Sequence, residues 1–359
     1  VNTNPTNMSG FKAKSKSYNS ITLQWNKNAS ATGYELQKWD GKKWVTLTKI
    51  NKNSTTTYTV KNLKASTTYK YRIRAYKTIG KTTQYSAYTT TLSVNTNPSN
   101  MSGYKVKSKT ATSVTLQWNK NASATGYELQ KWDGKKWVTL TKISKNSTTT
   151  YTVKSLKAST TYKYRIRAYK TIGKATQYSA YTATLSVNTN PTNMSGFKAK
   201  SKSYNSIMLQ WNKNTSATGY ELQKWDGKKW VSLTKIAKNS TTTYTVKSLK
   251  ASTTYKYRIR AYKTIGKTTQ YSAYTTTLSV NTNPTNMSGF KAKSKSYNSI
   301  TLRWNKNTSA TGYELQKWDG KKWVTLTKIS KNSTTTYTVK SLKASTTYKY
   351  RIRAYKTIG

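Results

Sequence analysis

Hydrophobic and polar residues alternate along this chain with a period of two. Ile21, Leu23 and Trp25 are separated by polar residues, and the same alternation returns at Tyr34 and Leu36. A period of two brings every second side chain to one face of an extended segment, which is typical of a half-buried β-strand. The pattern predicts strands near residues 9–16, 20–26, 33–39, 43–50, 56–60, 67–77 and 85–92.

Turn-forming residues separate these strands. Asn-Lys-Asn occupies residues 26–28 and again 51–53, and Asp40-Gly41 lies between two of the longer strands. Asn, Asp and Gly tolerate the backbone conformations that tight turns require. Seven short strands at even spacing therefore predict an antiparallel, immunoglobulin-like β-sandwich, and an all-β fold class.

The whole pattern recurs along the chain. The pentapeptide that begins at Val1 returns at Val94, Val187 and Val280, a period of 93 residues. A repeat of this length is too long for a solenoid unit and matches a small independent domain. The sequence therefore predicts four tandem domains, at residues 1–93, 94–186, 187–279 and 280–359.

The fourth repeat is shorter than the others. It ends at Gly359, the equivalent of Gly80, and lacks a counterpart of residues 81–93, which include the last predicted strand. One interpretation is that the chain is part of a longer array. The alternative is an open sheet edge that a strand from another copy completes, because an unpaired edge is a template for pairing.

Several framework positions carry a family resemblance. Trp25 ends the second predicted strand, Gly33-Tyr34-Glu35-Leu36 begins the third, and Leu63 stands six residues before Tyr69. In these positions the chain resembles the fibronectin type III family, in the form found in bacterial extracellular and cell-wall proteins. The resemblance implies a tyrosine corner at Tyr69 and a non-catalytic spacer or adhesive role. The integrin-binding tripeptide Arg-Gly-Asp of some family members is absent.

The period-two phase also predicts which side chains fill the core of each sandwich. The alternation turns Thr22 outward and the residues on either side of it inward. The predicted core consists of Trp25, Tyr34, Leu36, Leu63, Tyr69, Tyr71 and Ile73.

The residue types that are missing exclude many activities. The 359 residues contain no His and no Cys. Without them the chain has no Ser-His-Asp triad, no Cys nucleophile and no zinc finger. No apolar run is long enough to span a bilayer, so no membrane span is expected.

The eight acidic residues give no catalytic pair or metal site. They occupy two equivalent positions in every repeat, Glu35 and Asp40 in the first. Glu35 is expected to face outward beside Arg72 or Arg74, and Asp40 to begin a turn. We therefore expect no enzyme, no cofactor, no metal and no small-molecule substrate.

Two Trp residues flank the Asp40-Gly41 turn. The segment Trp39-Asp40-Gly41-Lys42-Lys43-Trp44 occurs four times, with Trp132 and Trp137 in the second repeat. Paired Trp side chains at a turn could form an exposed platform for sugar rings or bases. The alternative is that they cover the open end of the core. Exposed, paired rings would favour recognition, and buried rings would favour a spacer.

The chain is strongly basic. It carries 64 Lys and Arg against 8 Asp and Glu, a net charge of +56, and each complete repeat carries a net charge of +14. The first predicted strand is expected to present Lys12, Lys14 and Lys16 on one side. The sixth is expected to turn Lys70, Arg72, Arg74 and Tyr76 to one face, with Lys163, Arg165, Arg167 and Tyr169 as equivalents in the second repeat.

A charge excess of this size attracts polyanions through counterion release, without reading any sequence. The candidate surface for a polyanion or glycan therefore combines the sixth strand with Trp39, Lys42, Lys43 and Trp44. The expected partners are wall teichoic acid, acidic polysaccharide or extracellular nucleic acid, or other copies of the chain.

The sequence as a whole predicts a secreted or cell-surface structural array, a spacer or fibre, that adheres to anionic polymers. The alternative is a dedicated carbohydrate- or nucleic-acid-binding module that uses the paired Trp and basic residues.

Overall fold

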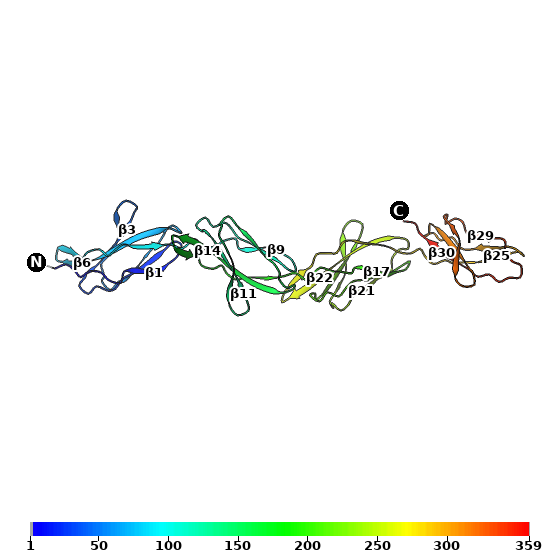
Figure 1. The fold of residues 1–359 in the computed structure, drawn as a ribbon, viewed down its shortest axis with the longest axis horizontal. Helices are drawn as coiled ribbons and strands as arrows, with labels where there is room; N and C mark the ends of the chain where they lie inside the picture. The colour runs from blue at the N-terminus through cyan, green and yellow to red at the C-terminus, as the bar shows by residue number, and fades with distance from the viewer. Residues whose placement is uncertain (1–2, 359) are drawn as a thin grey trace. The chain divides into compact units, whose positions relative to one another are not determined.

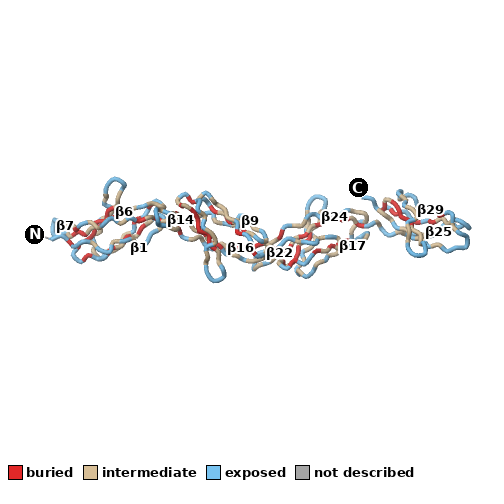
Figure 2. Tube along the Cα trace, in the orientation of Figure 1, coloured by how far each residue is buried: buried red, intermediate tan, exposed pale blue. Residues whose placement is uncertain are grey.

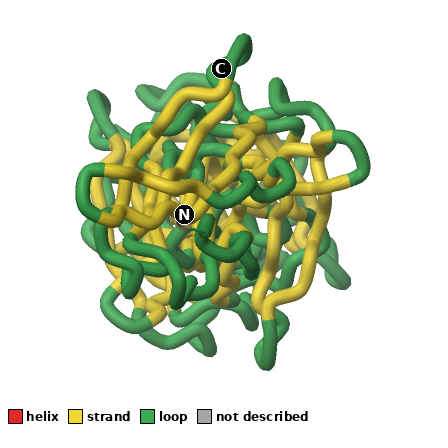
Figure 3. Tube along the Cα trace, turned by 90° about the vertical axis from the view of Figure 1, so that its left-hand side faces the viewer, coloured by secondary structure: helices red, strands yellow, loops and turns green. Residues whose placement is uncertain are grey.

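A computed structural model describes residues 3–358 of the chain. Those residues form only strands, turns and loops, as Figure 3 shows in yellow and green. By contacts the chain divides into two compact units, residues 1–156 with 160–189 and residues 157–159 with 190–359. The first unit contains the first two sandwiches and the second unit contains the last two.

The first sandwich consists of two antiparallel sheets (Figure 1). Its strands are β1 (Lys12–Lys16), β2 (Ile21–Gln24), β3 (Gly33–Trp39), β4 (Trp44–Ile50), β5 (Thr57–Val60), β6 (Thr68–Ile79), β7 (Thr82–Tyr85) and β8 (Leu92–Asn95). One sheet has the order β1-β2-β5. The other has the order β4-β3-β6-β7, and β8 also pairs with β6.

The second and third sandwiches repeat this arrangement. The second contains β9 (Lys105–Lys109), β10 (Val114–Gln117), β11 (Gly126–Trp132), β12 (Trp137–Ile143), β13 (Thr150–Val153), β14 (Thr161–Ile172), β15 (Ala175–Tyr178) and β16 (Leu185–Asn188). The third contains β17 (Lys198–Lys202), β18 (Ile207–Gln210), β19 (Gly219–Trp225), β20 (Trp230–Ile236), β21 (Thr243–Val246), β22 (Thr254–Ile265), β23 (Thr268–Tyr271) and β24 (Leu278–Asn281). The predicted all-β fold with tandem sandwiches is confirmed.

The fourth sandwich has two three-stranded sheets in its described residues, β25-β26-β29 and β28-β27-β30. Its strands are β25 (Lys291–Lys295), β26 (Ile300–Arg303), β27 (Gly312–Trp318), β28 (Trp323–Ile329), β29 (Thr336–Val339) and β30 (Tyr350–Tyr355). In the first sandwich the initial residues of β6 pair with β8. The sequence of the fourth repeat contains no counterpart of β8, and β30 begins only at Tyr350.

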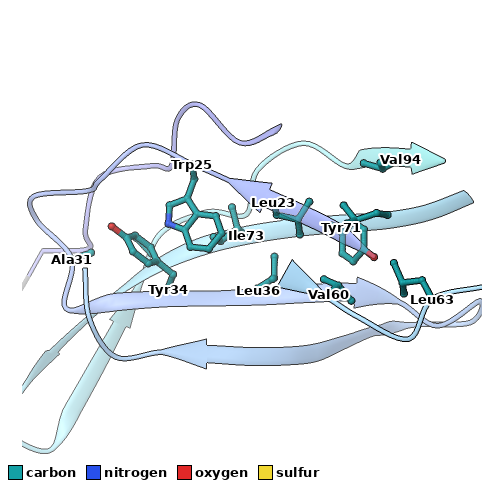
Figure 4. Close-up of a cluster of buried hydrophobic side chains, with 12 residues drawn as sticks. Leu23, Trp25, Ala31, Tyr34, Leu36, Val60, Leu63, Tyr71, Ile73 and Val94 are labelled. Carbon is teal, nitrogen blue, oxygen red and sulfur yellow. The ribbon is translucent and has the colours of Figure 1, made fainter. Parts of the chain in front are cut away.

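The core of each sandwich lies between its two sheets. Trp25 is 1% exposed, and Tyr34 and Leu36 are completely buried, as the sequence predicted. Figure 2 shows such buried stretches in red in every sandwich, and Figure 4 shows the Trp25 and Tyr34 side chains lying next to each other. Their rings meet edge to face with centroids 5.5 Å apart, a favourable geometry for an aromatic pair.

Tyr69, which the sequence placed in the core, is only partly buried and packs against the core's edge. Its hydroxyl accepts a hydrogen bond of 2.8 Å from the backbone N–H of Lys64. This is the upstream backbone bond that defines a tyrosine corner. The bond holds the phenol tip at the loop, which explains why the ring does not enter the core completely.

The prediction of a last strand at residues 85–92 is wrong. The structure has two short strands there, β7 and β8, and residues 86–91 between them are not a strand. The N–H groups of Ile73 and Ala75 on β6 donate to the hydroxyls of Thr89 and Ser86 and not to backbone carbonyls. Side chains thus take the acceptor role that a strand's backbone would have, so no regular ladder forms.

The sandwich and the sequence repeat are out of phase by a few residues. The predicted boundary between residues 93 and 94 falls inside β8. Thr96 is completely buried, and its hydroxyl accepts from Thr67 N–H and donates to Lys64 C=O. Residues just after the boundary therefore complete the preceding sandwich.

Candidate functional site

The outer face of the β4-β3-β6 sheet carries most of the predicted site residues. Strand register places Glu35 opposite Arg74 and Gln37 opposite Arg72. In the pairing of β3 with its other neighbour, β4, Trp39 lies opposite Trp44. The sequence therefore predicted correctly that Arg72 and Arg74 share a face, and that Glu35 has an arginine partner.

Arg74 and Glu35 form an ion pair within this face. The Arg74 Nη2 and Nε atoms lie 2.5 and 2.6 Å from Glu35 Oε2. Thr46 Oγ1 donates to the other carboxylate oxygen at 2.8 Å. Burial alone would raise the pKa of Glu35, but the hydrogen bonds from Thr46 and Arg74, with the charge of Arg74, hold that pKa below its usual value.

Both arginines are also stacked between aromatic rings. The guanidinium carbon of Arg72 lies 4.5 Å from the Trp44 ring centroid and 3.9 Å from that of Tyr88. The guanidinium carbon of Arg74 lies 3.8 Å from Tyr85 and 4.4 Å from Tyr88. Contacts of this kind contribute about 0.5–1 kcal/mol each at exposed sites and more when they are desolvated.

We call this alternating stack the cation–π ladder: Trp44, Arg72, Tyr88, Arg74 and Tyr85. It recurs in the second repeat on Arg165 and Arg167 and in the third on Arg258 and Arg260. Sequence reasoning missed Tyr85 and Tyr88, because their spacing of three residues does not place them on one face of a strand.

The fourth repeat shows what the two tyrosines do. Its sequence has no equivalent of Tyr85 or Tyr88, and among the described residues Arg351 stacks on Trp323 alone. The Arg353 side chain is 70% exposed, whereas its equivalents Arg74 and Arg167 are 25% and 24% exposed. Tyr85 at the end of β7 and Tyr88 in the segment after it therefore shield the guanidinium groups from solvent.

The Trp39–Trp44 pair is neither fully exposed nor fully buried, the two alternatives that the sequence left open. Both rings are half-buried, with centroids 5.6 Å apart and an interplanar angle of 66°. Trp132 and Trp137 repeat this geometry at 5.5 Å and 65°. An edge-to-face pair gives no shared flat surface on which a sugar ring or base could stack.

Tyr76 lies at the edge of this face and is 6% exposed. Its hydroxyl lies 2.5 Å from Asn51 Oδ1 and 3.3 Å from the Ile50 carbonyl oxygen. Tyr169, its half-buried equivalent, makes a longer bond to the Ile143 carbonyl. Both phenols thus reach across β3 or β11 to the end of β4 or β12 and do not point to solvent.

The lysines of the candidate surface are open to solvent. Lys70 and Lys163 are exposed on the long strands β6 and β14, and Lys42 and Lys43 are exposed in the β3–β4 turn. Asp40 accepts hydrogen bonds of 2.8 Å from the backbone N–H groups of both turn lysines. These two bonds hold the pKa of Asp40 below its usual value.

A β-bulge changes the predicted arrangement of lysines on β1. The register pairs Lys12 with Gln24, then shifts, so that Lys16 pairs with the buried Ile21. Lys16 therefore lies on the same side of the strand as Ile21, and partial burial lowers its pKa. The expectation that Lys12, Lys14 and Lys16 share one face is wrong, because an extra residue in a bulge shifts the alternation.

The carboxylates have structural partners in every repeat. Glu128 and Glu314 form the same pairs with Arg167 and Arg353 as Glu35 forms with Arg74. Residues 3–358 contain no group of three or more acidic residues that could hold a metal ion. The same residues include no helix long and apolar enough to cross a bilayer.

Two Asn-x-Ser/Thr triplets, the acceptor sequence for N-linked glycans, lie in folded loops. Asn28 is 6% exposed, and its Nδ2 donates to the Thr6 carbonyl at 2.7 Å. Asn53 Nδ2 donates to the Ala31 carbonyl at 3.1 Å. Both amides are thus engaged within the fold, where a glycan would displace these bonds.

Comparison with known proteins identifies the sandwich. The model of the fibronectin type III domain matches residues 4–92, 97–184, 189–278 and 282–359. Among solved structures, the chicken CNTN1 FN1-FN3 domains are 16% identical with a TM-score of 0.31, covering 78% of this chain and 100% of that one. A two-domain fibronectin type III segment from chicken tenascin is 18% identical with a TM-score of 0.35, covering 51% of this chain and 100% of that one.

Two curated bacterial proteins are also similar to this chain. Exoglucanase B of Cellulomonas fimi is 29% identical over 290 residues, which cover 75% of this chain and 25% of the relative. Endoglucanase B of the same organism is 27% identical over 286 residues, covering 73% of this chain and 26% of the relative. The matched region thus spans about a quarter of each relative's length.

Proposed function

The chain belongs to the fibronectin type III family, and we propose that its four repeats form a non-catalytic, extracellular spacer array that holds to anionic polymers through its basic surface. The spacer role is consistent with tandem domains of this family. The two relatives are named exoglucanase and endoglucanase, and these names support an extracellular place for the array.

The observation that carries the polyanion part is the distribution of charge. Every acidic side chain is bound to an arginine, a threonine or turn amides, whereas the exposed lysines outnumber the acids several-fold in each repeat. A net charge of +14 per complete repeat creates a field that attracts polyanions and releases their counterions.

Binding of the full chain to inorganic polyphosphate and to a neutral β-glucan tests this function. We expect polyphosphate to bind, with log affinity falling linearly as log salt concentration rises, and the β-glucan not to bind. Absence of polyphosphate binding at physiological salt would leave a passive spacer.

The same assay tests the sugar-binding alternative. Binding of the neutral glucan that is insensitive to salt, and lost when Trp39, Trp44 and their equivalents are changed to Ala, would establish a carbohydrate-binding module in place of the polyanion function.

A further inference from the structure

The two sheets of each sandwich differ in how their charge is compensated. Glu35 lies on β3 and Asp40 in the turn that follows it, and the same holds in each repeat. The β1-β2-β5 sheet and its equivalents contain no acidic residue. Cations on that sheet therefore have no carboxylate partner within it.

The outer surface of this sheet consists of hydrogen-bond donors around lysines. We call it the lysine face: Lys12, Lys14, Ser15, Thr22 and Thr59. Lys12, Lys14, Ser15 and Thr59 are exposed. Ser15 lies opposite Thr22, and the Thr22 and Thr59 hydroxyls lie 3.0 Å apart. Ammonium and hydroxyl groups together suit the oxygens of an anionic group.

The fourth repeat concentrates the charge further. Its β26 strand ends in Arg303, where the first repeat has Gln24, and the register places Arg303 directly opposite Lys291. Both side chains are exposed, and like charges opposite each other on neighbouring strands repel. A bound anion would remove this repulsion, because no acid of the same sheet can do so.

The chemistry of the free cations favours phosphate. Arginine forks suit carboxylates and phosphates alike, but in the first repeat Arg74 holds Glu35 and Arg72 donates to Gln37 Oε1 at 2.9 Å. In the three complete repeats the cations of the lysine face are ammonium groups, which bind phosphate as point charges, and Arg303 joins them in the fourth.

The lysine face also lacks an aromatic platform for nucleobases. Tyr58 of β5 packs against the core, and Phe11 before β1 does the same. The exposed rings of Tyr18, Tyr204 and Tyr297 belong to the turn beyond the first strand of their repeats, and Ala111 stands at this position in the second repeat. Base stacking, the usual source of affinity for single strands, has no partner on this face.

We propose that the lysine face binds an aliphatic phosphodiester polymer, such as a polyol phosphate, and that the arginine-bearing face does not. This inference rests on the proposed polyanion function and deepens it by naming the surface and the polymer. The arginines stabilise the sheet through the cation–π ladder, and the lysines of β1 contact the phosphates.

Two matched variants of the full chain test the assignment. One replaces eight lysines of the lysine face by Gln: Lys12, Lys14, Lys105, Lys107, Lys198, Lys200, Lys291 and Lys293. The control replaces eight exposed turn lysines by Gln: Lys42, Lys43, Lys135, Lys136, Lys228, Lys229, Lys321 and Lys322. Both lose the same net charge, so a difference between them reports contact and not the general field.

The probes are poly(glycerol phosphate), the polyuronate alginate and single-stranded poly-dT. For poly(glycerol phosphate) we expect the lysine-face variant to bind at least about tenfold more weakly than the turn variant and to show a shallower salt slope. Unmodified chain should bind poly(glycerol phosphate) more tightly than either of the other probes at equal charge concentration.

The possible results separate the two proposals. Equal losses in the two variants, or a greater loss in the turn variant, would overturn the lysine face while the polyanion function stands. Tighter binding of alginate or poly-dT would overturn the choice of polymer. If no anionic probe binds the unmodified chain, the proposed function itself fails. Unchanged thermal unfolding of both variants shows that any loss is not due to misfolding.

Discussion

Removal of the Tyr88 ring should destabilise the first repeat and expose its arginines. Tyr88 lies over both Arg72 and Arg74, so Tyr88→Ala removes two cation–π contacts worth about 0.5–1 kcal/mol each. Loss of the half-buried ring adds about 1–2 kcal/mol of apolar burial. The expected decrease in the free energy of unfolding is about 3 kcal/mol. Tyr88→Phe keeps the ring and should cost less than about 1 kcal/mol.

Hydrogen exchange on the full chain can measure this change within one repeat. Peptides that reach from Asn62 into β6 are unique to the first repeat, because the other repeats have Ser155, Ser248 and Ser341 at this position. A loss of about 3 kcal/mol corresponds to roughly hundredfold faster exchange of β6 amides if they exchange through unfolding of the repeat. Equal exchange in Tyr88→Ala and Tyr88→Phe would refute the reasoning, because the ring would then contribute nothing.

Three further predictions concern the core, the acid limit and one close approach. Leu36→Ala should cost about 2–5 kcal/mol while Thr22→Met is nearly silent in denaturant unfolding; the reverse order would contradict the strand phase. Hydrogen bonds from its threonine and arginine partners lower the pKa of Glu314 to about 2, so its stabilisation is complete above about pH 4.5 and is lost as the pH falls toward 2. Glu314→Gln should flatten the stability–pH curve between about pH 4.5 and 2, and an unchanged curve would argue against a stabilising role of the Glu314 carboxylate. Gly33→Ala should lower the melting temperature, since its Cβ would collide with the Ile50 carbonyl oxygen; a wild-type melting temperature would show that the strand moves freely.

The sequence predicted the sandwich well because the main signals are local. Alternation around Trp25 and Tyr34 depends only on which side chains face the core, and in the structure these side chains are buried as predicted. The β1 bulge and residues 86–91 were not predictable in this way. Ser86 and Thr89 belong to residue types that also occur in strands, and only the structure shows their hydroxyls replacing backbone acceptors on β6.

The candidate site was predicted less completely for a different reason. The alternation of the sixth predicted strand placed Arg72 and Arg74 on one face, but it could not show which cations are covered. Their cover comes from Tyr85 and Tyr88, which reach the face through pairing of β6 with β7 and the irregular segment after it. Side chains that are close in space but contributed by a non-strand segment leave no periodic signal in the sequence.

Arginine and lysine thus have different tasks in each complete repeat. Arg72 and Arg74 combine charge with a planar group that stacks on rings and donates hydrogen bonds, so they are held between rings and beside Gln37 and Glu35. A lysine at either position would lose the stacking contacts, and the sheet would lose stability. Lysines at exposed positions such as Lys12 have no such structural partner, and they supply the positive electrostatic field of the array. Changes in lysine number should therefore alter the electrostatic field of the array with little effect on its fold. Arg72→Lys and Arg74→Lys, which keep the charge, should destabilise the fold with little effect on that field.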